Sequence, residues 1–280
     1  MDIKDLLKLT RFEHALMLAL AVLIGQTIVL GSIPPLNLIL ALSLLVPIFS
    51  EMGAFALNDY FDIDTDRLNK KKDRPLVEGR ISPGFALFFS VASIILSTVF
   101  AFFINFNAFA IVVIFNAMAV IYNWRMKDLP LVGNVYIALT MAIPFIFGNY
   151  VVSDELTILA VVLAALGFVA GLAREIIKSV QDMEGDMAAR DSRTLPVMIG
   201  RKKSLVIAVI LYLFFIPLSA MPFFMGIGSS IAILIIALAD MLILRICYRT
   251  LKHDNLDYAR HMSLVAFFFG LVGILIAIIL

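Results

Sequence analysis

Long apolar runs separated by short polar segments make up most of the chain. Nine of these runs have the roughly 20 residues that a helix needs to cross the hydrocarbon core of a bilayer, about 30 Å thick. They cover residues 12–31, 36–57, 84–104, 106–124, 131–152, 157–177, 204–222, 226–246 and 261–280. The pattern therefore predicts an all-α polytopic membrane protein with nine transmembrane helices, forming one domain over residues 1–280.

Composition agrees with this prediction. Hydrophobic residues make up 62% of the chain, charged residues only 15%, and the mean hydropathy is +1.03, which excludes an ordinary soluble globular protein. The single cysteine, Cys247, rules out a disulfide within the chain, and the three scattered histidines lack the spacing of a zinc site. The net charge of +1 gives no reason to expect a nucleic-acid partner.

The distribution of basic residues predicts the orientation in the membrane. All 22 Lys and Arg residues lie in the N-terminal tail or near the loops after the second, fourth, sixth and eighth runs. Because Lys and Arg collect in cytoplasmic loops, the N-terminus is expected inside and the C-terminus outside the cell. Two longer polar loops, at about 62–83 and 181–203, then form a cytoplasmic cap.

Two acidic segments follow apolar runs on this predicted cytoplasmic side. Residues 58–66 read NDYFDIDTD and residues 178–186 read KSVQDMEGD, and their aspartates match at an offset of 120, from 62 to 182 and from 66 to 186. The sequence RPL at 74–76 is likewise echoed by RTL at 193–195. The chain thus resembles two related halves, which can bring the two acidic segments face to face across a cavity.

The spacing of the acidic side chains predicts a metal site. A step of four residues is about one helical turn, so Asn58, Asp62 and Asp66 are expected on one helix face, and Asp182 and Asp186 on another. Oxygen ligands of this kind suit Mg²⁺, which keeps positions free for water and phosphate. These five residues are the predicted metal-binding and catalytic residues.

Basic side chains beside the acidic segments predict an anionic substrate. Arg67, Arg74, Lys178 and Arg193 flank the predicted metal site, and a diphosphate bridged by Mg²⁺ suits such surroundings because the cations neutralise the remaining charge. The apolar helices behind the site could hold a long lipid tail.

The same residues resemble a known family. The set Asn58, Asp59, Asp62, Asp66, Arg74, Pro75, Gly79, Ile81 and Ser82 is similar to the first signature of the UbiA-type intramembrane prenyltransferases, and Arg174, Glu175, Lys178, Asp182, Gly185, Asp186, Arg193, Thr194 and Leu195 are similar to the second. Tyr122, Asn123 and Lys127 resemble the family's central basic segment. The resemblance implies a nine-helix bundle around a central cavity, dependence on Mg²⁺, and transfer of an isoprenyl group from its diphosphate to an acceptor.

Within that family, the wording NDYFD, REIIK and DMEGD is most similar to archaeal enzymes that add a second geranylgeranyl chain to geranylgeranylglyceryl phosphate. The resemblance thus implies an isoprenyl diphosphate donor, a lipid phosphate acceptor and membrane lipids as partners. An aromatic acceptor, such as a quinone precursor or haem, is the alternative. Ser179 and Gln181 stand where relatives commonly carry an acidic residue, so no third carboxylate is expected in the second segment.

Several charged residues have two interpretations. Cytoplasmic topology alone explains Lys70–Lys72 and 201–203, although Arg125, Lys127, Lys202 and Lys203 could also meet a phosphate on the acceptor. Glu51, two turns below Asn58, either lines the substrate pocket or is protonated or paired with a neighbouring helix. Arg11 and His14 either border the acceptor site or lie at a helix end. Asp240 is expected to pair with a basic group such as Arg245.

Other membrane protein classes fit the pattern less well. Ion-coupled secondary transporters also combine internal repeats with intramembrane carboxylates, but their sites lie near the bilayer midplane, whereas these carboxylates cluster at one surface. CDP-alcohol phosphotransferases also use Mg²⁺ and spaced aspartates, but their DG, AR and glycine-spaced DxxxD pattern does not occur in this chain.

Overall fold

The computed structural model describes residues 2–68, 71, 73–190 and 193–280, and within these the side chains of 185, 186, 189 and 190 are outside the description. In this part of the chain, nine helices are long and apolar enough to cross a membrane, which confirms the predicted count. They are α2 Phe12–Leu30, α3 Leu38–Phe61, α5 Pro83–Phe102, α6 Phe106–Trp124, α7 Val132–Val152, α8 Ile158–Arg190, α10 Arg201–Ser219, α12 Ser230–His253 and α13 Leu256–Ile279. Shorter helices are α1 Ile3–Thr10, α4 Ile63–Leu68, η1 Met126–Asp128, α9 Leu195–Ile199 and α11 Met221–Phe224.

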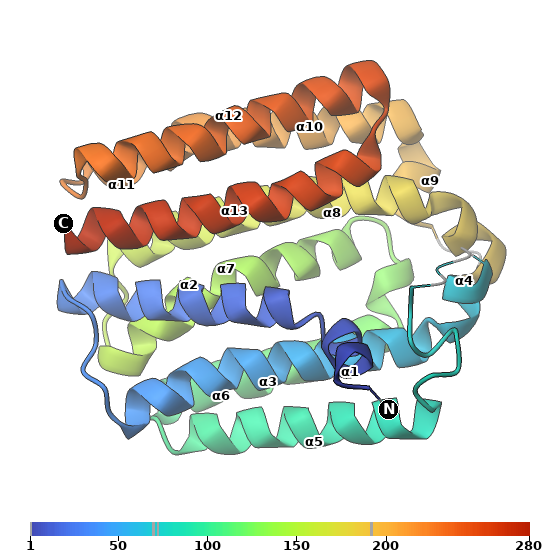
Figure 1. Ribbon diagram of the computed structural model, residues 1–280, viewed down its shortest axis with the longest axis horizontal. Helices are drawn as coiled ribbons and strands as arrows, with labels where there is room; N and C mark the ends of the chain where they lie inside the picture. The colour runs from blue at the N-terminus through green and yellow to red at the C-terminus, as the bar shows by residue number, and fades with distance from the viewer. Residues whose placement is uncertain (1, 69–70, 72, 191–192) are drawn as a thin grey trace.

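The long helices lie side by side in one bundle, and its two ends differ (Figure 1). The short helices α4 and α9 lie at one end, together with the polar segments that follow α3 and α8. The C-terminus of the chain lies at the opposite end. An odd number of spans places the two ends of a chain on opposite faces of a membrane, so this arrangement fits a multi-pass membrane protein.

Several helices extend beyond the apolar runs that predicted them. Helix α3 continues to Phe61, α8 to Arg190 and α12 to His253, while α13 begins at Leu256 rather than at 261. These extensions lie at the polar end, where water can solvate side chains while the backbone keeps its helical hydrogen bonds. Hydropathy marks the part of a helix inside the lipid, and it does not mark where the helix ends.

Side-chain caps define where many of the helices begin. Asn37, Ser82, Asn105, Ser229 and Asn255 precede α3, α5, α6, α12 and α13, and each accepts a hydrogen bond from a backbone N–H in the first turn. Such residues satisfy N–H groups that have no partner within the helix.

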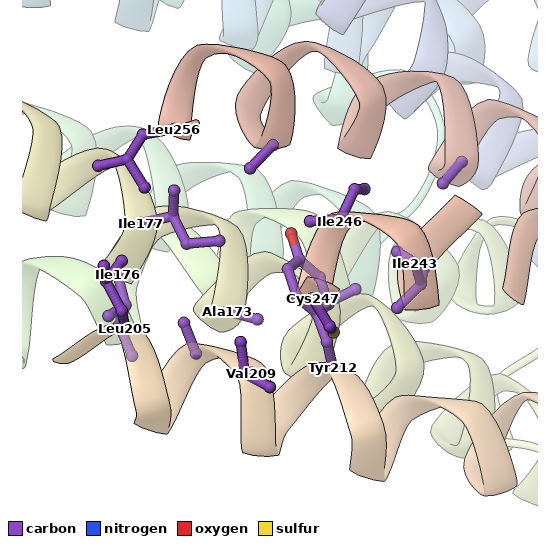
Figure 2. Packing of buried hydrophobic residues seen from close by; sticks show 14 of the residues in the cluster. Ala173, Ile176, Ile177, Leu205, Val209, Tyr212, Ile243, Ile246, Cys247 and Leu256 are labelled. Atoms are coloured by element: carbon purple, nitrogen blue, oxygen red, sulfur yellow. The ribbon is translucent and has the colours of Figure 1, made fainter. Parts of the chain in front are cut away.

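The largest packed core among the described residues lies between α8, α10, α12 and α13 (Figure 2). Ile176 of α8, Tyr212 of α10 and Ile243 of α12 are among its fully buried side chains. Small residues such as Ala173 and Ala208 separate these larger ones. Interfaces of this kind let helix backbones approach closely in lipid, where packing replaces the hydrophobic effect.

Glycines bring α2 and α7 into direct backbone contact. A β-carbon placed on Gly148 would lie 2.3 Å from the carbonyl oxygen of Val22, and one on Gly25 would lie 2.5 Å from that of Phe145. No side chain fits at either position without moving one helix. This contact fixes α2 against α7 and so sets the width of the space beside them.

Candidate active site

The first acidic segment lies at a break between two helices. Helix α3 ends at Phe61, Asp62 is its C-cap residue, and Asp66 lies on the separate short helix α4. The backbone N–H of Asp62 donates to Asn58 O at 2.9 Å and that of Asp66 to Asp62 O at 2.7 Å. The prediction of one continuous helix face is therefore wrong, because the helix ends at Asp62, but the four-residue hydrogen-bond spacing persists.

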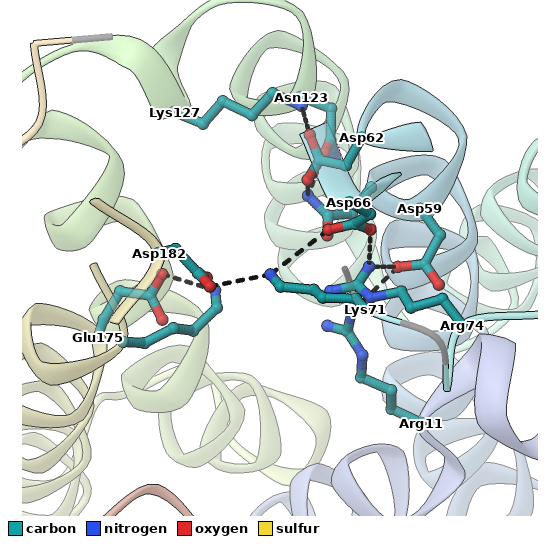
Figure 3. Close-up of polar contacts among 12 residues, drawn as sticks. Arg11, Asp59, Asp62, Asp66, Lys71, Arg74, Asn123, Lys127, Glu175 and Asp182 are labelled. Carbon is teal, nitrogen blue, oxygen red and sulfur yellow. Dashed lines mark hydrogen bonds and ion pairs between the residues drawn. The ribbon is translucent and has the colours of Figure 1, made fainter. Parts of the chain in front are cut away.

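Asp62 contacts an amide from α3 and a lysine from η1 (Figure 3). Asn58 Nδ2 donates to Asp62 Oδ2 at 2.9 Å and to Asn123 Oδ1 at 3.1 Å. Lys127 Nζ, in the short segment after α6, lies 2.6 Å from Asp62 Oδ1. The central segment of the chain thus completes the site of the first acidic segment.

Asp66 and Asp59 share an arginine. Arg74 contacts Asp59 and lies 2.9 Å from Asp66 Oδ2, and Arg11 lies 3.0 Å from Asp59 Oδ1. Asp59 is only 2% exposed, so its two arginine partners offset the cost of burying its charge. Burial raises the pKa of the Asp66 carboxyl above its ordinary value, an effect that the charges of Arg74 and Lys71 oppose.

One lysine joins the two acidic segments. Lys71 Nζ lies 3.4 Å from Asp66 Oδ1 and 2.9 Å from Asp182 Oδ1 of α8, as Figure 3 shows. The two segments therefore face each other, as their repetition predicts. The interpretation of Lys71 as a residue explained by topology alone is wrong, because α8 approaches it from a distant part of the chain. Lys70 and Lys72 lie outside the described residues.

The second acidic segment has fewer carboxylates near the site. Lys178 Nζ donates to Glu175 Oε1 at 2.9 Å, and Asn134 Nδ2 of α7 donates to Ser179 Oγ at 2.7 Å. Gln181 points elsewhere, because its amide contacts Asp257 of α13. Ser179 and Gln181, the two departures from the family pattern, are thus neutral side chains that form hydrogen bonds.

Three predicted site residues are placed differently or cannot be placed. Arg67 is exposed and pairs with Asp64 at 3.2 Å, and it lines neither of the chambers described below. Arg193 is also exposed, although its backbone N–H donates to Asp128 O at 3.2 Å. Asp186 lies on α8, but its side chain is outside the described residues.

The described residues enclose two connected chambers. The polar chamber is lined by Asn58, Asp62, Thr65, Asp66, Lys71, Arg74, Tyr122, Lys127, Asp128, Gly133, Asn134, Glu175, Lys178, Ser179, Asp182 and Thr194. The deep chamber shares Asn58, Lys71, Arg74, Tyr122, Glu175, Lys178 and Asp182 with it. From there it continues between the helices to Val46 of α3 and Phe147 of α7, and Asn58 to Val46 alone spans about 18 Å of helix. A polar mouth therefore leads into an apolar interior.

The other predicted substrate-binding residues line the deep chamber. Glu51, Arg11 and His14 lie on its wall, and Tyr122 packs against Tyr136 with ring centroids 5.0 Å apart. Asp240 does not lie there. Its carboxylate accepts a hydrogen bond of 2.9 Å from Ser219 Oγ, so the expected pairing with Arg245 is wrong; Arg245 packs over Tyr258 instead.

The donor groups of the polar chamber suit a hard divalent cation. No three acidic, histidine or cysteine side chains among the described residues form a ready cluster for a metal. However, the Lys71 ammonium lies between carboxylates of both segments, so this position already accommodates a cation. The surrounding donors are carboxylate and amide oxygens, the ligands that Mg²⁺ prefers.

Comparison with known proteins identifies the family. The profile of the UbiA prenyltransferase family matches residues 16–278. The chain belongs to the UbiA prenyltransferase family. The chain is 37% identical to the digeranylgeranylglyceryl phosphate synthase of Archaeoglobus fulgidus, covering 97% of this chain and 94% of that protein.

Solved structures share the UbiA fold. One described as giving structural and mechanistic insights into digeranylgeranylglyceryl phosphate synthase in membranes is 29% identical, with a TM-score of 0.73 and coverage of 99% of this chain and 98% of that one. A UbiA homolog from Archaeoglobus fulgidus bound to GPP and Mg²⁺ is 24% identical, with a TM-score of 0.68 and coverage of 96% and 99%. As a UbiA family member, the chain is a membrane prenyltransferase, and the transporter interpretation is set aside.

Proposed function

We propose that this protein transfers a geranylgeranyl group from geranylgeranyl diphosphate to the free hydroxyl of geranylgeranylglyceryl phosphate. The observation that carries the proposal is the joining of a polar chamber, rich in carboxylates and cations, to a deep apolar chamber. The digeranylgeranylglyceryl phosphate synthase of Archaeoglobus fulgidus, similar along nearly its whole length, supports this acceptor. The deep chamber suits isoprenyl tails, and the polar chamber suits a diphosphate.

Asn58, Asp62, Asp66 and Asp182 would hold Mg²⁺ in the polar chamber, and the sequence pattern adds Asp186. When bound there, Mg²⁺ would supply Lewis-acid stabilisation of the leaving diphosphate. A protein of the same fold that holds GPP and Mg²⁺ supports this assignment. The polar chamber is also expected to lie at the cytoplasmic side, since the Lys and Arg residues collect at this end.

The cations of the polar chamber bind the leaving group. Arg74, Lys127 and Lys178 line it, so as the bond between the first isoprenyl carbon and the diphosphate oxygen lengthens, they neutralise charge building on that oxygen. The acceptor hydroxyl oxygen then forms the ether bond to the same carbon. Its proton passes to an oxygen of the polar chamber or of the departing diphosphate.

The deep chamber protects the allylic cation that forms as this bond breaks. Phe55, Phe115 and Phe147 line it together with Tyr122 and Tyr136. Their faces are electron-rich and can stabilise a nearby positive charge, while the apolar wall excludes water that would otherwise capture the cation. Pro47 and Pro144 interrupt the hydrogen bonding of α3 and α7 at this depth.

The test is a reconstituted reaction. Purified protein is incubated with labelled geranylgeranyl diphosphate, geranylgeranylglyceryl phosphate and Mg²⁺, and the lipids are separated to detect a doubly prenylated product. Product that disappears with EDTA is the expected result. Slow Mg²⁺-dependent hydrolysis of the donor without transfer would retain the reaction class and overturn the acceptor.

A further inference from the structure

The two chambers differ in charge. Among the described residues, five carboxylates and four Lys or Arg side chains line the polar chamber. Six Lys or Arg side chains but only three carboxylates line the deep chamber. A surplus of cations beside an apolar interior is costly unless an anion offsets it. The deep chamber therefore has unmet capacity for a negatively charged group.

Three arginines produce this surplus. Arg11, Arg174 and Arg260 line the deep chamber and are absent from the wall of the polar chamber. They come from the junction of α1 and α2, from α8 and from α13 respectively. Segments far apart in the sequence thus direct guanidinium groups into one space. We refer to these three residues as the arginine cluster.

The arginine cluster is incompletely neutralised. Arg11 pairs with Asp59, which Arg74 already contacts, and Arg260 NH1 reaches Gln181 Oε1 only at 3.4 Å. Arg174 Nε is buried without a hydrogen-bond partner. A buried donor of this kind is expensive to leave unpaired, so it points to a ligand acceptor.

The three arginines also act on one another. The charge of Arg260 repels those of both Arg11 and Arg174, whereas Asp59 attracts Arg11 and Glu175 attracts Arg174. Glu51 attracts both Arg11 and Arg174. Burial lowers the pKa of Arg11 to about 10, so Arg11 remains charged at neutral pH. Asp59 is shared with Arg74 and Glu175 with Lys178, so these carboxylates leave the cluster short of negative charge. A phosphate monoester would add up to two negative charges.

We propose that the arginine cluster binds the phosphate of the lipid acceptor, an inference that rests on the proposed function. Guanidinium groups bind phosphate in a bidentate manner, so three of them from separate helices would fix the headgroup. The headgroup would then lie on the α2, α8 and α13 side of the deep chamber. The donor diphosphate would lie on the other side, in the polar chamber, with the acceptor hydroxyl between them.

This placement explains acceptor choice. Arg125, Lys202 and Lys203, which the sequence offers as alternative phosphate ligands, are exposed and line neither chamber. The arginine cluster lies inside, where a charge-assisted hydrogen bond is strong. An acceptor without the phosphate would leave the guanidinium groups unpaired, so the cluster selects a lipid monophosphate over a neutral aromatic acceptor.

The experiment measures acceptor binding without donor and with EDTA, so that the metal-dependent site does not contribute. Binding of geranylgeranylglyceryl phosphate in detergent is followed by calorimetry for wild type, Arg174→Gln and Arg260→Gln. Each variant should weaken binding on the order of tenfold to hundredfold, and Arg260→Lys should recover part of the loss. Binding of the same lipid without its phosphate should be weak and unchanged in every variant.

Arg245→Gln is the matched control, because Arg245 is exposed on the neighbouring helix α12 and lines neither chamber. Equal loss of phosphorylated and unphosphorylated lipid in the cluster variants, or unchanged binding of both, would overturn the proposal. Mg²⁺-dependent binding of a non-hydrolysable donor analogue should stay intact in Arg260→Gln. If wild type binds the lipid phosphate through the cluster but forms no product, the proposed function fails and the phosphate site stands.

Discussion

At the scale of residues, Asp62, Asp66 and Asp182 each already lie beside a basic side chain. Lys127 neutralises Asp62, Arg74 contacts Asp66, and Lys71 lies between Asp66 and Asp182. These pairs stabilise a group of like charges that would otherwise repel one another. When a divalent cation and a diphosphate bind, the metal would replace the basic side chains as partner of the carboxylates. The diphosphate would replace the carboxylates as partner of the basic side chains.

Replacing Asp62 or Asp182 with Asn should lower kcat by about two powers of ten or more, because metal assistance contributes several kcal/mol. The protein should still fold and bind the lipid acceptor. Asp64→Asn is the control, since the Asp64 side chain is 92% exposed on the same short helix. Steady-state kinetics at saturating Mg²⁺ measures the effect, and wild-type kcat in Asp62→Asn would exclude a role for that carboxylate in metal binding.

Lys71→Met should lower the melting temperature in EDTA by a few degrees and much less in excess Mg²⁺. Without Lys71, Asp66 and Asp182 lose a shared cation, and Mg²⁺ can replace it. The loss is limited because Lys71 is 21% exposed and partly exposed pairs contribute little. Lys203→Met, at an exposed position, is the control. Equal melting shifts with and without Mg²⁺ would contradict this account.

The sequence predicted which residue types form the site better than it predicted individual side chains. The repeat and its spacing were enough to predict that Asp62 and Asp182 lie in one site, the polar chamber. Lys71, however, enters the site through its contact with Asp182 of α8, and that contact joins distant parts of the chain. The prediction for Arg67 fails for a different reason, because Arg67 pairs locally with Asp64 on the same short helix and lines neither chamber. The two arginine partners of buried Asp59 come from other elements.

At the scale of elements, close backbone contacts set the geometry of the chambers. Helix α7 lines the deep chamber and packs directly on α2 through Gly25 and Gly148. Apolar runs predicted both helices, but hydropathy carries no information on which faces meet. The glycines are a usable signal only when the neighbouring helix is known.

Gly148→Ala should destabilise the protein by on the order of 1–3 kcal/mol, because the added carbon would overlap the Val22 carbonyl oxygen at 2.3 Å and force α2 and α7 apart. Gly270→Ala provides a matched control, since nothing lies within 4 Å of the equivalent carbon there, and a helical alanine is mildly favourable. Thermal unfolding in detergent compares the two. Similar melting temperatures for both variants would show that the helices can separate freely.

At the scale of the whole molecule, the two ends of the bundle differ in basic residues, and this difference predicts the orientation in the membrane. Counting apolar runs predicted the nine membrane-length helices found in the described part of the chain, since length and hydropathy are strong local signals. The basic residues collect at the end that holds the polar chamber, so that end should face the cytoplasm. Helix boundaries at this end were predicted poorly, because polar helical extensions resemble loops in sequence.

A cysteine-accessibility experiment tests this orientation. In a Cys247→Ser background, Lys203→Cys should react with a membrane-impermeant maleimide only in inside-out vesicles, and Asp154→Cys only in right-side-out vesicles. Both positions are exposed and lie at opposite ends of the bundle. The reverse labelling pattern would place the polar chamber outside the cell.

The break at Asp62 gives the two halves of the site unequal stiffness. Asp182 lies within the 33-residue helix α8, whereas Asp66 lies on a six-residue helix that cannot sustain itself without its contacts. Binding of donor and Mg²⁺ would therefore order chiefly α4, which carries Asp66. Most of the conformational entropy lost when the site assembles would be lost by this short helix. Amide hydrogen exchange should slow at 63–68 when donor and Mg²⁺ bind and change little at 174–182. Helix α8 would then keep its conformation during binding, and α4 would adjust to the ligand held against α8.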